Sequence, residues 1–539
     1  MNIIDEIKIK LKETLKELGV DVELNGIIIE KSKDLAHGDY ATNVAMKSCR
    51  LFNKKPLDVA NLIVSSFKMD EVDHIEIAGP GFINFFMKKD ALASIIKRII
   101  SEGDDFGRGE DKHFKVNVEF VSANPTGDLH IGHARGAAIG DSICRILSFA
   151  GYDVTREYYI NDAGNQINHL AESLIERYKE CLGLSFKLPE DGYHGEDVAI
   201  IAKQIKDECG SDLLSRSDYF EFFKNEGKRR ELDKIKVDLN SFGVKFDVFS
   251  SELEVRGNGS INKELDYLSK YTYIQDGATF LRTTDFLDDK DRVIVKSNGD
   301  YTYFMPDIVY HVNKISRGFD LLIDVLGADH HGYINRMKSA LMMHGYTKDS
   351  LEVELIQMVR FIKDGEEMKA SKRTGNAYTI RELIEEVGKD ASRYFFAMRA
   401  ASSHLDFNMD LAIEQSSNNP VYYAQYAHAR LCSILDSASD IGIDVNGTKL
   451  KENSEMALLK HLASFPELVN SAALERAPYR ITNYIHELAE KIHAFYTECR
   501  VINRDQLEAS KSRLALCKAA KQVMKNALYL VGVSAPTHM

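Results

Sequence analysis

Residues 123 to 133 read Ala-Asn-Pro-Thr-Gly-Asp-Leu-His-Ile-Gly-His. Before this segment, residues 116–121 place apolar side chains at alternate positions, which predicts a strand. After it, residues 134–150 read as a helix that ends at Gly151, a residue type favoured just past helix ends. A strand, a tight loop and a helix N-terminus together aim backbone N–H groups at a phosphate. The segment therefore predicts a phosphate-binding α/β unit.

Two histidines stand at the expected start of that helix. The imidazoles of His130 and His133 can donate hydrogen bonds to charge that develops on a transferring phosphoryl group. Gly132 has no Cβ, so a flat ring can approach its backbone closely. The alternative is a surface turn that happens to hold two histidines. The preceding strand and the small residues Gly136 and Gly140 in the helix favour the catalytic interpretation.

Length and composition limit the class of protein. At 539 residues the chain has room for two to four domains, and 44% hydrophobic content supports sizeable cores. A net charge of −13 argues against a general binder of polyanions. A local basic patch can still bind RNA on an acidic protein. Such a patch lies within residues 358–373 and contains Arg360, Lys363, Lys369, Lys372 and Arg373.

Cysteine usage and the N-terminus indicate the compartment. The seven cysteines are scattered and form no C-x-x-C pair, so we expect neither a disulfide framework nor a structural zinc site. Residues 1–20 are amphipathic and predict a folded helix instead of a signal peptide. No apolar run approaches the roughly 18 to 20 residues of a membrane span. We expect a cytoplasmic protein that is not attached to a membrane.

Three regions are expected along the chain. Residues 1–108 begin with helix and end with strands at 74–77 and 82–87. Residues 109–410 alternate strands with helices, which is typical of a mainly parallel sheet, and carry a charged insertion at about 175–290. Residues 411–539 lack strand patterns and predict packed helices. The expected fold class is α/β: a Rossmann-like parallel-sheet catalytic domain with an α+β N-terminal domain and an all-α C-terminal domain. The strand candidates of the middle region are 116–121, 154–159, 293–296, 301–304, 321–326 and 353–362.

A lysine-rich loop follows the last strand candidate. Asp364-Gly365 is a strong turn signal, and residues 369–376 then read Lys-Ala-Ser-Lys-Arg-Thr-Gly-Asn. Taken alone, such a loop is usually a solvated surface. A lysine ammonium is also a mobile point charge that suits a leaving pyrophosphate.

Together the two segments resemble the signatures of class I aminoacyl-tRNA synthetases. The wording from Val121 to Gly136 is most similar to that of arginyl-tRNA synthetases. The second signature of the class is K-M-S-K-S, and Lys369 and Lys372 match its two lysines. Ala370 stands where the pattern has methionine, which leaves open how the two lysines divide their work. The resemblance implies that His130, His133, Lys369 and Lys372 are catalytic, and that Gly132, His130, Ser371 and Lys372 bind ATP.

The loop Gly327-Ala-Asp-His-His-Gly332 follows the strand candidate at 321–326. Loops at the carboxyl ends of parallel strands bind ligands in such sheets. Asp329 can accept hydrogen bonds from ribose hydroxyls, whereas a metal site and a plain turn are the alternatives for the histidine pair. The resemblance implies that this loop lines the nucleotide and amino-acid pockets, with Gly327 and Asp329 toward ATP and His331 toward the amino acid.

A pocket for a guanidinium needs carboxylates and carbonyl-type acceptors, because a desolvated cation must be paired. Glu119 and Asn124 flank the first signature, and Tyr303 and Asp307 are four residues apart, although Pro306 favours a helix that starts after Met305. Each of these residues could also be an ordinary cap or surface group. The resemblance implies that Asn124, Tyr303 and Asp307 hold arginine in the segment that includes Tyr310 and His311. The full set expected to bind arginine is Glu119, Ser122, Asn124, His133, Tyr303, Asp307 and His331.

Two further segments resemble the RNA-binding parts of the same family. In the N-terminal region Phe82 can offer a face for an unpaired base and Asn84 can read its edge. In the C-terminal region, helical spacing puts Tyr422, Tyr426 and Arg430 on one stripe with Tyr423 beside it. A core position is the alternative for each aromatic residue.

The sequence therefore predicts an arginine–tRNA ligase that forms arginyl-adenylate from ATP and transfers arginine to the 3′-terminal adenosine of tRNA(Arg). Mg²⁺ is expected with ATP, held largely by phosphates and water, and no zinc is expected. The resemblance implies that arginine activation needs bound tRNA, and we expect a monomer. The alternatives are another class I synthetase, a nucleotidyltransferase without tRNA, and a non-catalytic tRNA-binding paralogue.

Overall fold

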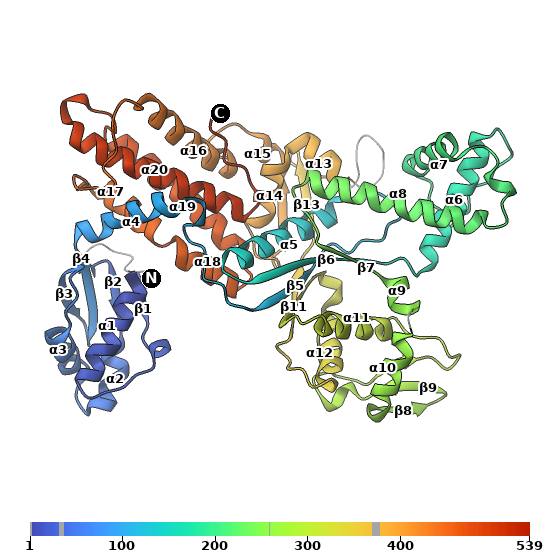
Figure 1. The fold of residues 1–539 in the computed structure, drawn as a ribbon, viewed down its shortest axis with the longest axis horizontal. Helices are drawn as coiled ribbons and strands as arrows, with labels where there is room; N and C mark the ends of the chain where they lie inside the picture. The colour runs from blue at the N-terminus through green and yellow to red at the C-terminus, as the bar shows by residue number, and fades with distance from the viewer. Residues whose placement is uncertain (1–2, 32–36, 258, 369–377) are drawn as a thin grey trace.

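A five-stranded parallel sheet lies at the centre of the protein (Figure 1). The computed structural model describes residues 3–31, 37–257, 259–368 and 378–539. The strand order is β12-β11-β5-β6-β7. The strands are β5 (Lys115–Glu119), β6 (Asp153–Ile160), β7 (Val248–Ser251), β11 (Leu321–Gly327) and β12 (Leu351–Ile356). Because the chain leaves β5 toward β6 and later adds β11 on the other side, a crevice forms at the carboxyl ends of β5 and β11.

Helix α5 (Ile131–Phe149) follows β5, as the sequence predicts. The helix packs against the sheet through small residues. A Cβ on Gly140 would lie 2.4 Å from Cγ of Phe120, so only glycine fits there, whereas a Cβ on Gly136 would meet nothing within 4 Å. The glycine at position 140 therefore sets the close approach of α5 to the end of β5.

The strand predictions need four corrections. Residues 301–304 lead into α11 (Phe304–Ser316), where Pro306 is tolerated because the first helical turn needs no N–H donor there. The candidate 293–296 corresponds to β10 (Arg292–Val295), which belongs to a small antiparallel sheet. The run 353–362 divides into β12 and β13 (Val359–Lys363), because the N–H of Gln357 bonds to Ala401 and not to the sheet. Strand β7 was not predicted.

Two groups of helices extend from the sheet; the range predicted as an insertion, about 175–290, covers most of the first group and only the first part of the second. Helices α6 (Asn165–Cys181), α7 (Glu196–Cys209) and α8 (Tyr219–Ser241) form one group with its own apolar core. Figure 1 shows α8 reaching from the sheet to α6 and α7. The second group consists of α9 (Glu252–Gly257), α10 (Ser260–Leu268), α11, α12 (Ile334–Met343) and the sheet of β8 (Thr272–Gln275), β9 (Ala278–Leu281) and β10. The parallel strand β7 lies between the two groups in sequence, so the insertion is not continuous.

The N-terminal region is an α+β unit with a separate core. Its antiparallel sheet has the order β1-β2-β4-β3 and packs with α1 (Ile3–Glu17), α2 (Val44–Phe52) and α3 (Pro56–Ser66). The strands are β1 (Ile29–Lys31), β2 (Tyr40–Thr42), β3 (Val72–Ala78) and β4 (Phe82–Met87). The next helix, α4 (Lys89–Glu102), packs instead on helices of the C-terminal region.

The C-terminal region is all helical and shares one core with α5. A sheet of β14 (Glu366–Glu367), β13 and β15 (Leu405–Asn408) leads into it. Helices α13 (Ile380–Val387) and α14 (Lys389–Ala397) precede it, and its own helices are α15 (Met409–Ile413), α16 (Pro420–Ser437), α17 (Asn453–Ala463), α18 (Phe465–Leu474), α19 (Pro478–Glu498) and α20 (Leu507–Leu530). Arg393 of α14 is fully buried and joins the parts, since it donates to Asp141 of α5 at 2.6 Å and to the carbonyl of Val531 at 3.1 Å.

The predicted fold class is confirmed by this arrangement. All seven cysteines are free. None of the helices that the described residues form combines the length and apolar character needed to cross a membrane.

Candidate active site

The turn after β5 is strained. Val121 and Ser122 have φ values of 69° and 42°, in the left-handed region that a β-branched residue such as valine rarely enters. This turn brings the Ser122 hydroxyl back to Glu119, to which it donates at 2.9 Å, while it accepts from the N–H of Tyr159 at 3.0 Å. The loop that carries the first signature therefore leaves the sheet in a fixed direction.

The two histidines of the signature lie together at the N-terminus of α5. Their ring centroids are 3.9 Å apart. His130 caps the helix, because its Nδ1 accepts from the N–H of Gly132 at 3.1 Å, which leaves the proton of the neutral ring on Nε2. Burial and the neighbouring His130 lower the pKa of His133 to about 4, and burial lowers the pKa of His130. At neutral pH the pair consists of two neutral hydrogen-bond donors and not of cations.

Gly132 makes room for one of these rings. A Cβ at this position would lie 2.8 Å from Cε1 and 2.9 Å from Nδ1 of His130. In this structure the imidazole of His130 is therefore the flat group that occupies the space where a Cβ of residue 132 would lie.

The second signature meets the first at its C-terminal flank. Lys369, Ser371 and Lys372 lie outside the described residues. Directly after them, the carbonyl of Tyr378 accepts from the N–H of Ile131 at 2.8 Å, and the N–H of Ile380 donates to the carbonyl of Leu129 at 2.9 Å. Thr379 pairs with His130 as an isolated bridge and caps α13. The residues that follow the lysine-rich segment, from Tyr378 onward, therefore bond to the loop that carries His130.

The loop after β11 occupies the same edge of the sheet. Residues Ala328–Tyr333 form a 3₁₀ helix, with Asp329, His330 and His331 exposed. A Cβ on Gly327 would lie 2.6 Å from Oδ1 of Asp329. Within the described ranges, no three His, Cys, Asp or Glu side chains are grouped so that they could hold a metal ion.

Asp307, in the first turn of α11, lies near Tyr159, Glu119 and Glu252, and these four residues are called the Asp307 recess below. In the described part of the chain the Asp307 carboxylate has no hydrogen-bond or ion-pair partner. Burial, with the nearby carboxylates of Glu252 and Glu119, raises the pKa of Asp307 to about 7. The Tyr159 hydroxyl is buried without a partner among the described residues, and burial with the charges of Glu252 and Asp307 raises its pKa. An unpaired carboxylate that shares a recess with other acids is suited to a cationic ligand.

A buried charge network lies under this recess. Lys314 is fully buried, donates to Glu119 and lies 3.0 Å from Asp324. His311 lies 2.7 Å from Asp324 through Nε2. Burial acts to raise the pKa of Asp324, but Lys314 and His311 together hold it well below its usual range. These contacts hold α11 against β5 and β11, and they pair the charge of Glu119 with that of Lys314.

Sequence reasoning missed Lys314 and Glu252, and it expected the stretch 157–166, which contains Tyr159, near the α-amino end or the nucleotide without giving Tyr159 a role of its own. Lys314 could have been found, because residues 307, 311 and 314 fall on one face of a helix. Tyr159 and Glu252 follow from the pairing of β6 with β7, and β7 carried no clear strand pattern.

The other residues predicted for arginine are dispersed. Tyr303 is 83% exposed at the start of α11, so its side chain does not line the recess with Asp307. Asn124 donates to Gln166, the second residue of α6. Tyr310 donates to Glu157 at 3.0 Å, inside the sheet. The structure therefore brings Glu119, Ser122 and Asp307 close together but leaves Tyr303 and His331 at the surface.

The tyrosine stripe of α16 forms an aromatic ladder. Tyr422 and Tyr426 stack with centroids 6.3 Å apart, and Tyr423 stacks on His493 of α19 at 4.4 Å. Tyr426 is 40% exposed, and the Arg430 guanidinium lies 5.8 Å from the ring centroid of Tyr496. His493 was missed because it belongs to another helix.

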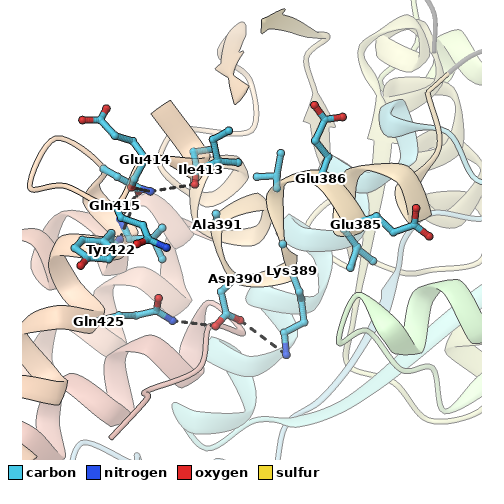
Figure 2. A pocket seen from close by; sticks show the side chains of 16 residues that line it. Glu385, Glu386, Lys389, Asp390, Ala391, Ile413, Glu414, Gln415, Tyr422 and Gln425 are labelled. Atoms are coloured by element: carbon cyan, nitrogen blue, oxygen red, sulfur yellow. Dashed lines mark hydrogen bonds and ion pairs between the residues drawn. The ribbon is translucent and has the colours of Figure 1, made fainter. Parts of the chain in front are cut away.

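The first turns of α16 face the catalytic region. Figure 2 shows a cleft between α13, α14, α15 and α16 into which Tyr422 projects. Gln425 donates across it to Asp390 of α14 at 2.9 Å and to the carbonyl of Ser534 at 3.0 Å. Tyr422 and Gln425 thus lie at the junction between the two regions.

The two residues predicted to contact RNA in the N-terminal region differ in exposure. Phe82 is 39% exposed, whereas Phe85 is fully buried in the core. Asn84 is only 4% exposed, because β4 runs between β2 and β3, so it does not share the surface of Phe82.

The strand order of the parallel sheet and the histidine pair at its first crossover are those of class I aminoacyl-tRNA synthetases. The family described as tRNA synthetases class I (R), catalytic domain, matches residues 95–431. The Arginyl tRNA synthetase N terminal domain matches residues 5–87, and the DALR anticodon binding domain matches residues 424–539.

Full-length relatives agree with these matches. The arginine–tRNA ligase of Bacillus subtilis is 50% identical over 560 residues, and that of Anoxybacillus flavithermus is 50% identical over 558; each comparison covers 100% of both chains. The arginyl-tRNA synthetase structure from Thermus thermophilus has the same fold, with a TM-score of 0.76, 22% identity and 100% of both chains covered. The chain belongs to the arginyl-tRNA synthetase family. The predicted family and enzyme type are confirmed.

Proposed function

We propose that the protein activates arginine with ATP and transfers the arginyl group to the 3′-terminal adenosine of tRNA(Arg). The observation that carries this proposal is the unpaired Asp307 carboxylate, which lies in a recess at the same sheet edge as the histidine pair. A guanidinium is permanently charged and fork-shaped, so it can pair directly with this carboxylate, which His311 and Arg336 influence only through their charge.

Arginine recognition would centre on Asp307. The bound cation would hold Asp307 ionised, and the Tyr159 hydroxyl would gain a ligand to bond with. Glu119 is already ion-paired with Lys314, so it would not bind the guanidinium itself. With Ser122 it would shape the Asp307 recess. Tyr303, Asn124 and His331 would complete the site only after their side chains move.

ATP would occupy the crevice between the loops after β5 and β11. His130 and His133 would donate hydrogen bonds to the α-phosphate as charge develops there, and the N-terminus of α5 would add its own N–H groups. Gly327 and Asp329 would lie toward the ribose, and Ser371, Lys372 and Lys369 toward the departing pyrophosphate. No residue needs to act as a nucleophile, because positioning and electrostatics suffice. Mg²⁺ would enter with ATP, held by phosphate oxygens and water.

The tRNA would contact both ends of the chain. The ladder of Tyr422, Tyr423, Tyr426 and Arg430 offers stacking faces and a cation, to which His493 adds a further ring. Phe82 would offer one more face at the N-terminal region, while the buried Asn84 supports the sheet.

The remaining expectations belong to the same proposal. The boundaries near residues 108 and 410, the monomeric state, the cytoplasmic location and the need for tRNA in arginine activation are supported by the family resemblance.

Transfer can be tested with modified tRNA. Class I membership implies attack by the 2′-hydroxyl of the terminal adenosine. We expect the protein to charge tRNA(Arg) that ends in 3′-deoxyadenosine with labelled arginine, and not tRNA that ends in 2′-deoxyadenosine. The reverse pattern would overturn the proposed acceptor, and charging with a different amino acid would overturn the substrate.

A further inference from the structure

Helix α8 reaches the histidine loop through one lysine. The Nζ of Lys234 lies 2.7 Å from Glu231, 3.2 Å from Asp197 at the start of α7, and 3.3 Å from Asp128. Asp128 stands two residues before His130. A single ammonium therefore joins the helical insertion to the loop that positions the histidine pair.

One turn further along, α8 reaches the other signature. Asp238 accepts from the Arg381 guanidinium at 2.8 and 3.1 Å. Arg381 is the second residue of α13 and stands two positions after Thr379, which pairs with His130. Positions 234 and 238 are one helical turn apart, so they face the same way.

These contacts line one cleft. A cavity of about 950 Å³ is bordered by Asp128, His130, Lys234, Thr379 and Arg381. Glu231 is fully buried, and Lys234 and Asp197 are mostly covered, so water screens these charges less than those of a surface pair, whereas Asp128 is exposed. The long α8 visible in Figure 1 thus ends against both segments that surround His130.

We propose that Lys234 and Asp238 are positioning residues, through which α8 holds the histidine loop and the first turn of α13 in the register that catalysis needs. The proposal rests on the proposed function. Neither residue touches the Asp307 recess, which is built on α11, β5, β6 and α9. Loss of either contact should therefore lower turnover and leave arginine binding unchanged.

Asp128→Asn is the sharpest variant. It removes one charge from the loop and leaves Lys234 paired with Glu231 and Asp197, so no buried lysine loses all its partners. Asp238→Asn is its counterpart at the second contact. The matched control is Asp233→Asn, which breaks an exposed pair with Arg229 on the same helix.

The test is pyrophosphate exchange with arginine and tRNA(Arg), with thermal unfolding measured beside it. We expect Asp128→Asn and Asp238→Asn each to lower kcat about tenfold while KM for arginine changes less than about twofold. Asp128→Glu should recover most of the loss. The double variant Lys234→Met/Asp128→Asn should have the same kcat as Lys234→Met, because both substitutions break the same contact between Lys234 and Asp128.

Other outcomes would overturn the proposal. Wild-type kcat in both asparagine variants, equal losses in the Asp233→Asn control, or parallel changes in kcat and KM would each contradict it. Failure of the wild-type protein to exchange with arginine would instead contradict the proposed function, so the two failures are distinguishable.

Discussion

Ile131 and Tyr378 are joined by a 2.8 Å backbone hydrogen bond, although they belong to segments far apart in the chain. Ile131 is the first residue of α5, between the two histidines, and Tyr378 directly follows the lysine-rich segment. The bond from Ile380 to Leu129 repeats the contact on the other side. The two signatures are therefore held together by main-chain atoms on both sides of His130.

Asp307 gives arginine binding a pH dependence. Below its pKa of about 7 the carboxyl is protonated, and the guanidinium has to displace that proton. KM for arginine should therefore rise by up to about tenfold for each pH unit below 7 and level off above about 8. Steady-state exchange between pH 6 and 8.5 measures this.

The Asp307→Asn variant supplies the control for that profile. It should weaken arginine binding by at least about 30-fold and remove the pH dependence, because a buried charge partner is lost. In the free protein the raised pKa means that the native state binds more protons than the unfolded state, so the wild type loses stability as pH rises from about 4 to 7. At pH 8 the Asp307→Asn protein should be more stable than the wild type. A variant less stable than the wild type would contradict the conclusion that the Asp307 carboxylate has no partner in the free protein.

His133 should matter for turnover and not for binding. His133→Ala should lower kcat about 10²- to 10³-fold, as expected for loss of a preorganised donor to developing charge, with KM for arginine nearly unchanged. Because the pKa of His133 is about 4, lowering the pH to 6 should not mimic the substitution. The exposed His113, outside the site, provides His113→Ala as the control. Equal losses in kcat and arginine affinity would contradict the role given to His133.

Two glycines of α5 form a matched pair. Gly140→Ala would place a Cβ 2.4 Å from the Phe120 ring and should cost about 1–3 kcal/mol of the free energy of unfolding. Gly136→Ala meets open space and should be neutral or stabilise by up to about 1 kcal/mol, since alanine favours helix. Urea denaturation of both variants measures the difference. Similar values would show that α5 does not pack on Phe120 as described.

Lys314 should be required for stability. Lys314→Met leaves Glu119 without its cation and Asp324 with His311 alone in a buried site, and should cost about 3–5 kcal/mol. Lys10→Met breaks only the exposed pair with Glu13 and should leave the free energy of unfolding nearly unchanged. A Lys314→Met protein as stable as Lys10→Met would mean that the network under the recess is absent.

The aromatic ladder should contribute to tRNA affinity. Tyr426→Ala should weaken tRNA binding by about 1–3 kcal/mol, the range for loss of one base-stacking ring, whereas Tyr426→Phe should bind nearly as well as wild type. Filter binding without arginine or ATP measures this. Unchanged binding by Tyr426→Ala would place the tRNA elsewhere.

The sequence predicted best where the signal is local. The strand, loop and helix around His130 were correct because alternation, a tight loop and a closing glycine lie within forty residues of each other. The division into a sheet region and a helical region also follows from local patterns. Strand β7 was missed because Val-Phe-Ser-Ser at an edge position has no alternation to detect.

The chemistry of the site depended more on contacts between distant segments. Asp307 was predicted, but its raised pKa depends on Glu252 and Glu119 from other elements. Glu119 was predicted to be free for arginine, whereas the helix period of α11 brings Lys314 to it. The orientation of Tyr303 and the burial of Asn84 likewise depend on what packs around them.

Pyrophosphate exchange with each of the twenty amino acids, with and without tRNA(Arg), tests the central claim that this site activates arginine. Of the twenty amino acids, we expect arginine to be the only one that supports exchange, and we expect that exchange only when tRNA(Arg) is present. Exchange with any other amino acid, or with none, would contradict the claim.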